Sequence, residues 1–425
     1  MKTQNKILFK NTISLYIMNI VKLLFPILTL PYLTRILTTN TYGVVVYVKS
    51  IIVYVQLIID YGFLLSATKK ITMIQGDKKE VGKIVGDTIV EKICLSLVAL
   101  IIFIILTFTI PILANYKGFA LLYFLSSAIT IFILDFLYRG IEKMNLIAIP
   151  YVVSKTISTV LLFVCVKSDK NLMLIAILEV IGNLFAAIVS MMLLKKENIF
   201  VSITNMKKWI HDIKESTVYF ISNFATTIFG ALTTIIIGFY FSTNEIAYWG
   251  LCMQILSATK ALYNPITNSL YPYMIKSKNL KIINKINTIM LIPMIIGSII
   301  VFIYSADVVK IIGGEKYIYA GSILKYLLPA FIFSFYSMIY GWPVLGAIDK
   351  NKETTKTTII ASISQIIGMF IIIYFKKFDL KYFAINCSIS EMLLFLMRYI
   401  YYLKNKKSFN YSEVKKWVYS KGKHY

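Results

Sequence analysis

Twelve long apolar stretches, separated by short polar loops, run along this chain. Each stretch has about the 20 apolar residues that a helix needs to cross the hydrocarbon core of a bilayer. The pattern therefore predicts an all-α polytopic membrane protein with twelve transmembrane helices. The predicted spans cover roughly residues 12–36, 44–66, 91–112, 119–138, 148–166, 172–194, 217–240, 247–270, 287–306, 321–345, 357–375 and 382–403.

The composition is too apolar for a soluble protein of this length. Hydrophobic residues make up 58% of the 425 residues, and the mean hydropathy is +0.73. The net charge of +25 is spread over many loops, and only three of the 45 basic residues are Arg. Because bidentate phosphate recognition relies on Arg, we expect no nucleic-acid partner. Attraction to anionic membrane lipids explains the spread of Lys instead.

The loops alternate in charge, which predicts the orientation of the chain. Loops on the side of the N-terminus hold 29 Lys and Arg, and the opposite loops hold 8. Short loops rich in Lys and Arg stay in the cytoplasm. We therefore expect a multi-pass membrane protein with both termini in the cytoplasm.

The spans repeat after about half of the chain. Spans 1 to 6 match spans 7 to 12 at offsets of roughly 196–210 residues, and Thr38-Thr39-Asn40 matches Ser242-Thr243-Asn244. Six spans in each half predict two parallel six-helix bundles around a central cavity. The expected domains are an N-terminal bundle at 1–194, a basic cytoplasmic linker helix at 195–216, a C-terminal bundle at 217–403 and a basic cytoplasmic tail at 404–425.

Eight basic residues fall within spans or at their edges. A charge at the centre of a membrane helix costs roughly 2.5–3.5 kcal/mol, so it normally faces a cavity or a partner. Snorkelling to an interface is one interpretation for Lys92, Lys325, Arg35 and Arg398. The deeper positions suit a water-filled, cationic cavity better. The predicted substrate-binding residues are Lys22, Arg35, Lys49, Lys155 and Lys260.

The acidic residues within spans are fewer. Asp60, Asp135, Glu179 and Glu391 either pair with nearby Lys or carry a coupling ion, and the sequence leaves both open. A cavity with more fixed cations than anions attracts a negative group, such as a phosphate, a pyrophosphate or an acidic sugar. The chain has no Cys/His cluster with metal-ligand spacing. We expect no metal, no cofactor and no catalytic residue.

Four short stretches together form a recognisable pattern. They are Leu30-Pro31-Tyr32-Leu33-Thr34-Arg35-Ile36-Leu37, Tyr42-Gly43, Asp60-Tyr61-Gly62-Phe63 and Phe136-Leu137-Tyr138-Arg139-Gly140-Ile141-Glu142-Lys143-Met144. The pattern resembles Wzx-type polysaccharide flippases of the multidrug/oligosaccharidyl-lipid/polysaccharide exporter superfamily, although that family usually has Gln at the position of Arg139. The resemblance implies a protein that moves undecaprenyl-pyrophosphate-linked oligosaccharides of O-antigen and lipopolysaccharide type across the bacterial plasma (inner) membrane. It also implies contact with a polysaccharide polymerase and chain-length machinery.

Other functions remain open at this stage. A lipid II flippase of the same superfamily is the first alternative, because those proteins use basic residues on the helices that here carry Lys22, Lys49 and Lys260. A multidrug exporter fits a basic cavity less well. A membrane polymerase lacks its large external loop here, and an acyltransferase lacks a His within the spans, since the two His are His211 and His424. A scaffold without transport is the last alternative.

The orientation makes the first testable prediction. In a cysteine-free background, Lys117→Cys and Asn244→Cys should react with an impermeant thiol reagent added outside intact cells. The variants Lys79→Cys, Lys207→Cys and Lys352→Cys should react only after the membrane is permeabilised. Labelling of the second group in intact cells would reverse the topology.

Overall fold

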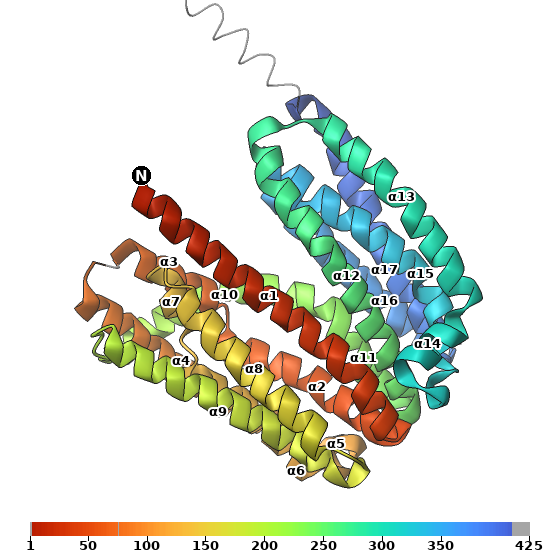
Figure 1. The fold of residues 1–425 in the computed structure, drawn as a ribbon, viewed down its shortest axis with the longest axis horizontal. Helices are drawn as coiled ribbons and strands as arrows, with labels where there is room; N and C mark the ends of the chain where they lie inside the picture. Colours follow the sequence, from red (N-terminus) through yellow and green to blue (C-terminus); the bar gives the residue numbers. More distant parts are fainter. Residues whose placement is uncertain (1, 75, 410–425) are drawn as a thin grey trace, which may run out of the picture. The chain divides into compact units, whose positions relative to one another are not determined.

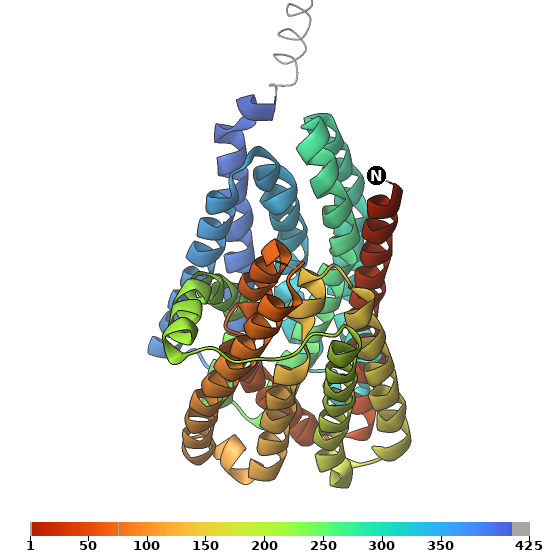
Figure 2. The same cartoon turned by 90° about the vertical axis from the view of Figure 1, so that its left-hand side faces the viewer.

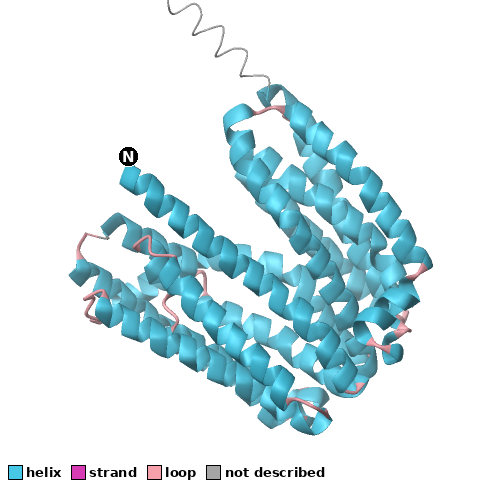
Figure 3. Ribbon diagram, viewed as in Figure 1, coloured by secondary structure: helices cyan, strands magenta, loops and turns pink. Residues whose placement is uncertain are grey.

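The chain is helical throughout, and no strand occurs in the part that the structure describes (Figure 3). The computed structural model describes residues 2–74 and 76–409. Most of the predicted tail, from residue 410 on, lies outside these ranges. The predicted all-α class is confirmed.

The contacts divide the chain into two compact units. The N-terminal unit runs to Thr227 and includes Thr234–Ala247, and the C-terminal unit comprises Ile228–Thr233 and the chain from Tyr248 on. The helices up to Thr227 (red to green in Figure 1) are α1 (Lys2–Ile36), α2 (Thr39–Asp60), α3 (Phe63–Ile74), α4 (Lys78–Thr109), α5 (Pro111–Asn115), α6 (Lys117–Ile129), η1 (Thr130–Phe132), α7 (Asp135–Gly140), α8 (Asn145–Cys165), η2 (Asp169–Asn171), α9 (Leu172–Lys196) and α10 (Met206–Thr227).

The remaining helices run from Ile228 to Phe409. The last long helix, α17, returns beside α15 and α16 and packs mainly against them (Figure 2). These helices are η3 (Ile228–Leu232), α11 (Thr233–Tyr240), α12 (Thr243–Ser277), α13 (Leu280–Ile303), α14 (Ser305–Gly313), η4 (Glu315–Tyr317), α15 (Ala320–Ile339), η5 (Tyr340–Leu345), η6 (Gly346–Ile348), α16 (Asn351–Tyr374), α17 (Leu380–Lys404) and η7 (Lys406–Phe409).

Ten helical segments among the described residues are long and apolar enough to cross a membrane. They coincide with ten of the twelve predicted spans. The span predicted at 217–240 falls on α10 to α11, where the apolar part, Gly230–Tyr240, is shorter than a full span. The span predicted at 247–270 falls on α12, which is helical but more polar. The polar residues of α12 include Lys260. The predicted bundle boundary at residue 217 lies inside α10, which packs with the N-terminal unit.

The stretch Asp60-Tyr61-Gly62-Phe63 forms the tight connection between α2 and α3. Tyr61 ends α2 in the left-handed conformation with φ of 39°, and Gly62 follows with φ of 83°. A side chain at Gly62 would also collide with α10, since a Cβ there would lie 2.6 Å from that of Tyr219. Glycine therefore permits both the turn and the close approach of α10.

The stretch around Arg139 makes a second close crossing, between α7 and α3. A Cβ at Gly140 would lie 2.5 Å from a methyl carbon of Ile71. Two residues further on, Glu142 is left-handed with φ of 58°, and its carbonyl accepts a 2.7 Å hydrogen bond from Asn11 of α1. The stretches that resemble polysaccharide flippases thus hold helices together.

The short repeated motif makes reciprocal contacts with its own counterpart. The Thr39 hydroxyl donates a 2.6 Å hydrogen bond to the side-chain oxygen of Asn244, and the Thr243 hydroxyl donates one to Asn40. Gly43 follows on α2, and a Cβ there would overlap the carbonyl oxygen of Thr243. These contacts relate the two segments as a two-fold axis would, which supports the internal repeat inferred from sequence spacing.

The linker between α9 and α10 crosses the N-terminal part of α4. Its backbone passes so close that a Cβ at Gly82 or Gly86 would overlap a linker carbonyl. Beyond this crossing, the buried Asp87 accepts hydrogen bonds from the backbone N–H of Thr204 at 2.8 Å and from the indole N–H of Trp209 at 2.9 Å. A charge-assisted network on one buried carboxylate therefore fixes the start of α10 to α4.

Arg398 of α17 braces a break in a neighbouring helix. The helix α15 passes into η5, where Gly341 has a ψ of −115° that no helix uses. The guanidinium of Arg398 donates to the carbonyl of Ser337 at 2.6 Å and to the hydroxyl of Thr358 at 2.9 Å, and Arg398 is 8% exposed. Snorkelling was the wrong interpretation for Arg398, because its donors satisfy polar groups inside the C-terminal unit.

The hydrogen bonds of Arg398 predict a specific loss of stability when this residue is replaced. Arg398→Lys keeps the charge but cannot reach several acceptors at once, so it should lower the free energy of unfolding by about 1–3 kcal/mol. Thermal unfolding in detergent measures the change. The control Lys404→Ala removes an exposed cation from the same helix and should leave the midpoint unchanged. Equal midpoints for Arg398→Lys and wild type would contradict the assigned role.

Candidate functional site: cations within the helices and a polar cavity

Two of the predicted cavity lysines have no carboxylate within ion-pair distance among the described residues. Lys22 of α1 is exposed and lies over the ring of Tyr151, 5.1 Å from its centroid. Lys49 of α2 is exposed and lies 5.6 Å from the centroid of the Tyr123 ring. Cation–π contacts hold an ammonium group without neutralising it, so both charges stay available to an anion. Arg35 is also exposed, in the last turn of α1.

The other two predicted lysines are paired. Lys155 of α8 lies 2.5 Å from a carboxylate oxygen of Glu179 on α9, and Lys260 of α12 forms an ion pair with Glu391 on α17. The Glu391 side chain is 5% exposed, whereas that of Lys260 is 32% exposed. A buried carboxylate needs such a partner, because an isolated charge in this environment costs several kcal/mol.

The remaining two acids differ from each other. Asp60 binds Lys92 at 2.8 Å and accepts a 2.9 Å hydrogen bond from Gln56. Lys92 is 5% exposed, so pairing replaces the snorkelling that its place near an interface had indicated. Asp135, at the start of α7, has no ion-pair partner among the described residues. Of the two roles left open for Asp60 by the sequence, the structure shows the pairing.

A cavity of about 380 Å³, lined by both charged and apolar side chains, lies inside the N-terminal unit. Helices α1, α2, α4, α7, α8 and α9 all contribute to its wall. The charged side chains that line it are Lys22, Asp60, Lys92, Asp135 and Lys155. The structure therefore brings together, in one unit, five of the residues that the sequence indicated, whereas Lys260 and Glu391 belong to the C-terminal unit.

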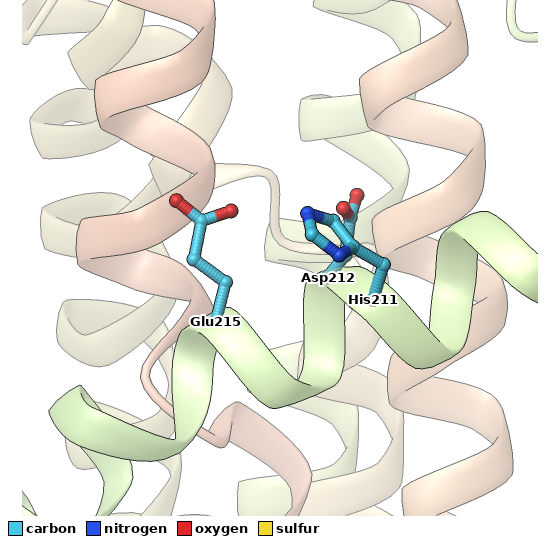
Figure 4. Close-up of side chains that lie close together, drawn as sticks. All are labelled: His211, Asp212 and Glu215. Carbon is cyan, nitrogen blue, oxygen red and sulfur yellow. The ribbon is translucent and has the colours of Figure 1, made fainter.

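His211, Asp212 and Glu215 cluster on α10 in a way that could hold a metal ion (Figure 4). The ammonium group of Lys70 on α3 already binds both acids, at 2.9 Å from Asp212 and 2.8 Å from Glu215. The hydrogen bond from Lys70 lowers the pKa of Glu215. Lys70 supplies the positive charge that a metal ion would bring. We therefore interpret the cluster as ion pairs that join α10 to α3.

Two features could not be found from the sequence: the uncharged polar residues of the cavity, and the hydrogen bonds of Asp87 that join α10 to α4. Gln56, Tyr151, Ser154 and Asn183 line the cavity, but each is a common residue in a membrane helix. The sequence does contain one indication of the contact between the linker and α4. Gly82 and Gly86 stand one turn apart just before Asp87, and paired small residues permit close backbone approach.

The chain belongs to the polysaccharide biosynthesis protein family, whose model matches residues 8–278. Two curated relatives, each named "Putative O-antigen transporter", are 25% identical to it. The one from Shigella dysenteriae aligns over 378 residues, 86% of this chain and 93% of the relative. The one from Escherichia coli (strain K12) aligns over 417 residues, 94% of this chain and 98% of the relative. The resemblance inferred from the short stretches is confirmed.

Solved structures of low sequence identity share the fold. The lipid II flippase MurJ in an inward closed conformation has a TM-score of 0.68 at 17% identity, covering 94% of this chain and 89% of its own. An inward-facing multidrug resistance MATE family transporter of the MOP superfamily has a TM-score of 0.63 at 14% identity, covering 92% and 99%. These likenesses confirm the fold class and carry no information on the substrate.

The Lys260–Glu391 pair predicts a non-additive effect on stability. Lys260→Ala leaves Glu391 buried without a cation, so the free energy of unfolding should fall, by less than the roughly 3–5 kcal/mol of a fully buried pair. Adding Glu391→Gln removes the orphaned charge and should recover most of the loss. Thermal unfolding of the two singles and the double measures the coupling. A double variant no more stable than Lys260→Ala would contradict the pairing.

Proposed function

We propose that this protein is a flippase for undecaprenyl-pyrophosphate-linked oligosaccharides. It moves the repeat units of a surface polysaccharide from the inner to the outer leaflet of a bacterial plasma membrane by alternating access. The observation that carries the proposal is the presence of Lys22 and Lys49, cations without a carboxylate partner among the described residues, in apolar helices of a polysaccharide biosynthesis protein. Both termini lie in the cytoplasm, as the loop charges require.

The chemistry of the two lysines fits the anchor of such a substrate. A Lys ammonium is a compact point charge that binds phosphate without demanding one orientation. The pyrophosphate is the part common to all lipid-linked repeat units, whereas their sugars differ. Arg35, Lys155 and Lys260 belong to the same proposed set of cations, and the last two become available when their Glu partners are neutralised or displaced. Glu179 and Glu391 are then the groups through which an ion would couple to transport.

A lipid II flippase is the second candidate. Its support is the likeness of the fold to the lipid II flippase MurJ. The O-antigen transporter names of the two curated relatives, which align over most of the chain, favour the first candidate. In this proposal the protein transports its substrate and does not catalyse a reaction. Its basic loops contact the anionic lipids of the inner leaflet, and a polymerase receives the flipped units.

A reconstituted system tests whether Lys49 binds the pyrophosphate of the substrate. Wild type and Lys49→Ala are compared in proteoliposomes with two lipid-linked oligosaccharides, one neutral and one bearing a carboxylate. Loss of one charge-assisted contact should slow flipping of both substrates by about tenfold or more. The control Lys170→Ala removes an exposed loop cation of the same unit and should flip normally. A defect confined to the acidic glycan would move the positive charge from the pyrophosphate to the sugars, and no flipping by wild type would refute the function.

A further inference from the structure

The cavity of the N-terminal unit is balanced in charge. Lys22, Lys92 and Lys155 face it together with Asp60 and Asp135, and Lys155 binds Glu179. Glu179 does not line the cavity but neutralises Lys155, so two ammonium groups, Lys22 and Lys92, stand there against the two carboxylates. An anion inside the cavity would meet acidic side chains and a cation would meet lysines, so the wall favours a neutral ligand that can both donate and accept hydrogen bonds.

Several polar groups at the cavity have unused hydrogen-bonding capacity within the described part of the chain. The carboxylate of Asp135 accepts no hydrogen bond there. Asn183 donates to the carbonyl and the hydroxyl of Ser126, at 3.1 and 2.9 Å, which leaves its side-chain oxygen without a partner. The hydroxyl of Tyr151 also has no partner. Two acceptors and a phenol, from α7, α9 and α8, therefore converge on one space.

Apolar groups line the same space. Ile133, Ile147 and Pro150 contribute to the wall, together with the rings of Phe136 and Tyr151. A pyranose ring presents hydroxyl groups around its edge and C–H groups on its faces, so it matches a wall with both kinds of group. The volume of about 380 Å³ is at the lower end of small-molecule sites, which suits one or two sugar rings rather than a long glycan.

The geometry points to a sugar-binding subsite: a neutral sugar ring next to the pyrophosphate occupies this cavity during transport. The inference rests on the proposed function and adds the part of the substrate that the N-terminal unit holds. Lys22 borders the cavity beside Tyr151. Because the pyrophosphate is bonded directly to the first sugar, Lys22 can contact the phosphate oxygens while the ring lies between Tyr151, Asp135 and Asn183.

Cysteine protection tests this placement directly. Ile133→Cys is introduced into a cysteine-free background that still flips substrate, and its reaction with N-ethylmaleimide is timed in proteoliposomes. The probes are the lipid-linked oligosaccharide extracted from cells that make this protein and undecaprenyl pyrophosphate without sugars. The extracted glycolipid should slow the reaction by about tenfold at saturation, and the sugar-free lipid should not. Ser168→Cys, in an exposed loop of the same unit, should react equally under all conditions.

A second variant tests the residues assigned to the ring. In the Ile133→Cys background, Asp135→Asn should raise the glycolipid concentration needed for half-protection by about tenfold. Asp169→Asn, whose carboxylate accepts only the backbone N–H of Thr38 among the described residues, should leave that concentration unchanged. An unchanged concentration for Asp135→Asn would remove Asp135 from the subsite and overturn the assignment.

The outcomes separate this inference from the proposed function. Equal protection by the sugar-free lipid would mean that the cavity binds the pyrophosphate or closes when it binds elsewhere. The assignment of the cavity to a sugar ring would then be wrong. Absence of protection in vesicles that flip the glycolipid would also overturn the subsite, while the flippase function would stand. Absence of flipping by wild type would remove both.

Discussion

The cost of leaving a polar group without a partner in a lipid environment governs this structure. A backbone carbonyl or a charged side chain that water cannot reach needs a partner within the protein. Arg398 satisfies a carbonyl next to the break at η5, Glu391 is buried only together with Lys260, and Lys92 is buried only together with Asp60. Lys22 and Lys49 have no carboxylate partner among the described residues, so we assign their charges to binding the substrate.

The spans could be predicted from the sequence because hydropathy reports on them directly. The thickness of the bilayer core and the rise per residue of a helix together set how many apolar residues a span needs. The partners of the charged residues could not be predicted, because Lys155 and Glu179 meet across two helices whose rotation about their axes depends on packing. The depth of Arg398 in the membrane likewise indicated snorkelling, although depth says nothing about which face of α17 the residue occupies.

The stretches that resemble flippases act in two ways in this chain. Asp60 contributes a carboxylate to the cavity wall, and Gly62 two residues later permits the close approach of α10. Tyr138 lines the cavity, and Gly140 permits the crossing of α7 over α3. Polar and glycine positions alternate within a few residues, so one short stretch sets both the wall of the cavity and the packing of the helices that form it. A sequence motif of this kind marks a site together with its scaffold.

The contact between the repeated motifs bears on how the chain arose. In a two-fold dimer, residue i of one subunit meets residue j of the other, while j meets i. Thr39 with Asn244 and Thr243 with Asn40 obey that rule inside a single polypeptide. Duplication and fusion of a six-helix protein that paired with a second copy of itself would leave such a contact. The ion pairs of the two halves differ: Lys155, which binds Glu179, comes from the fifth predicted span of its half, whereas Lys260, which binds Glu391, comes from the second.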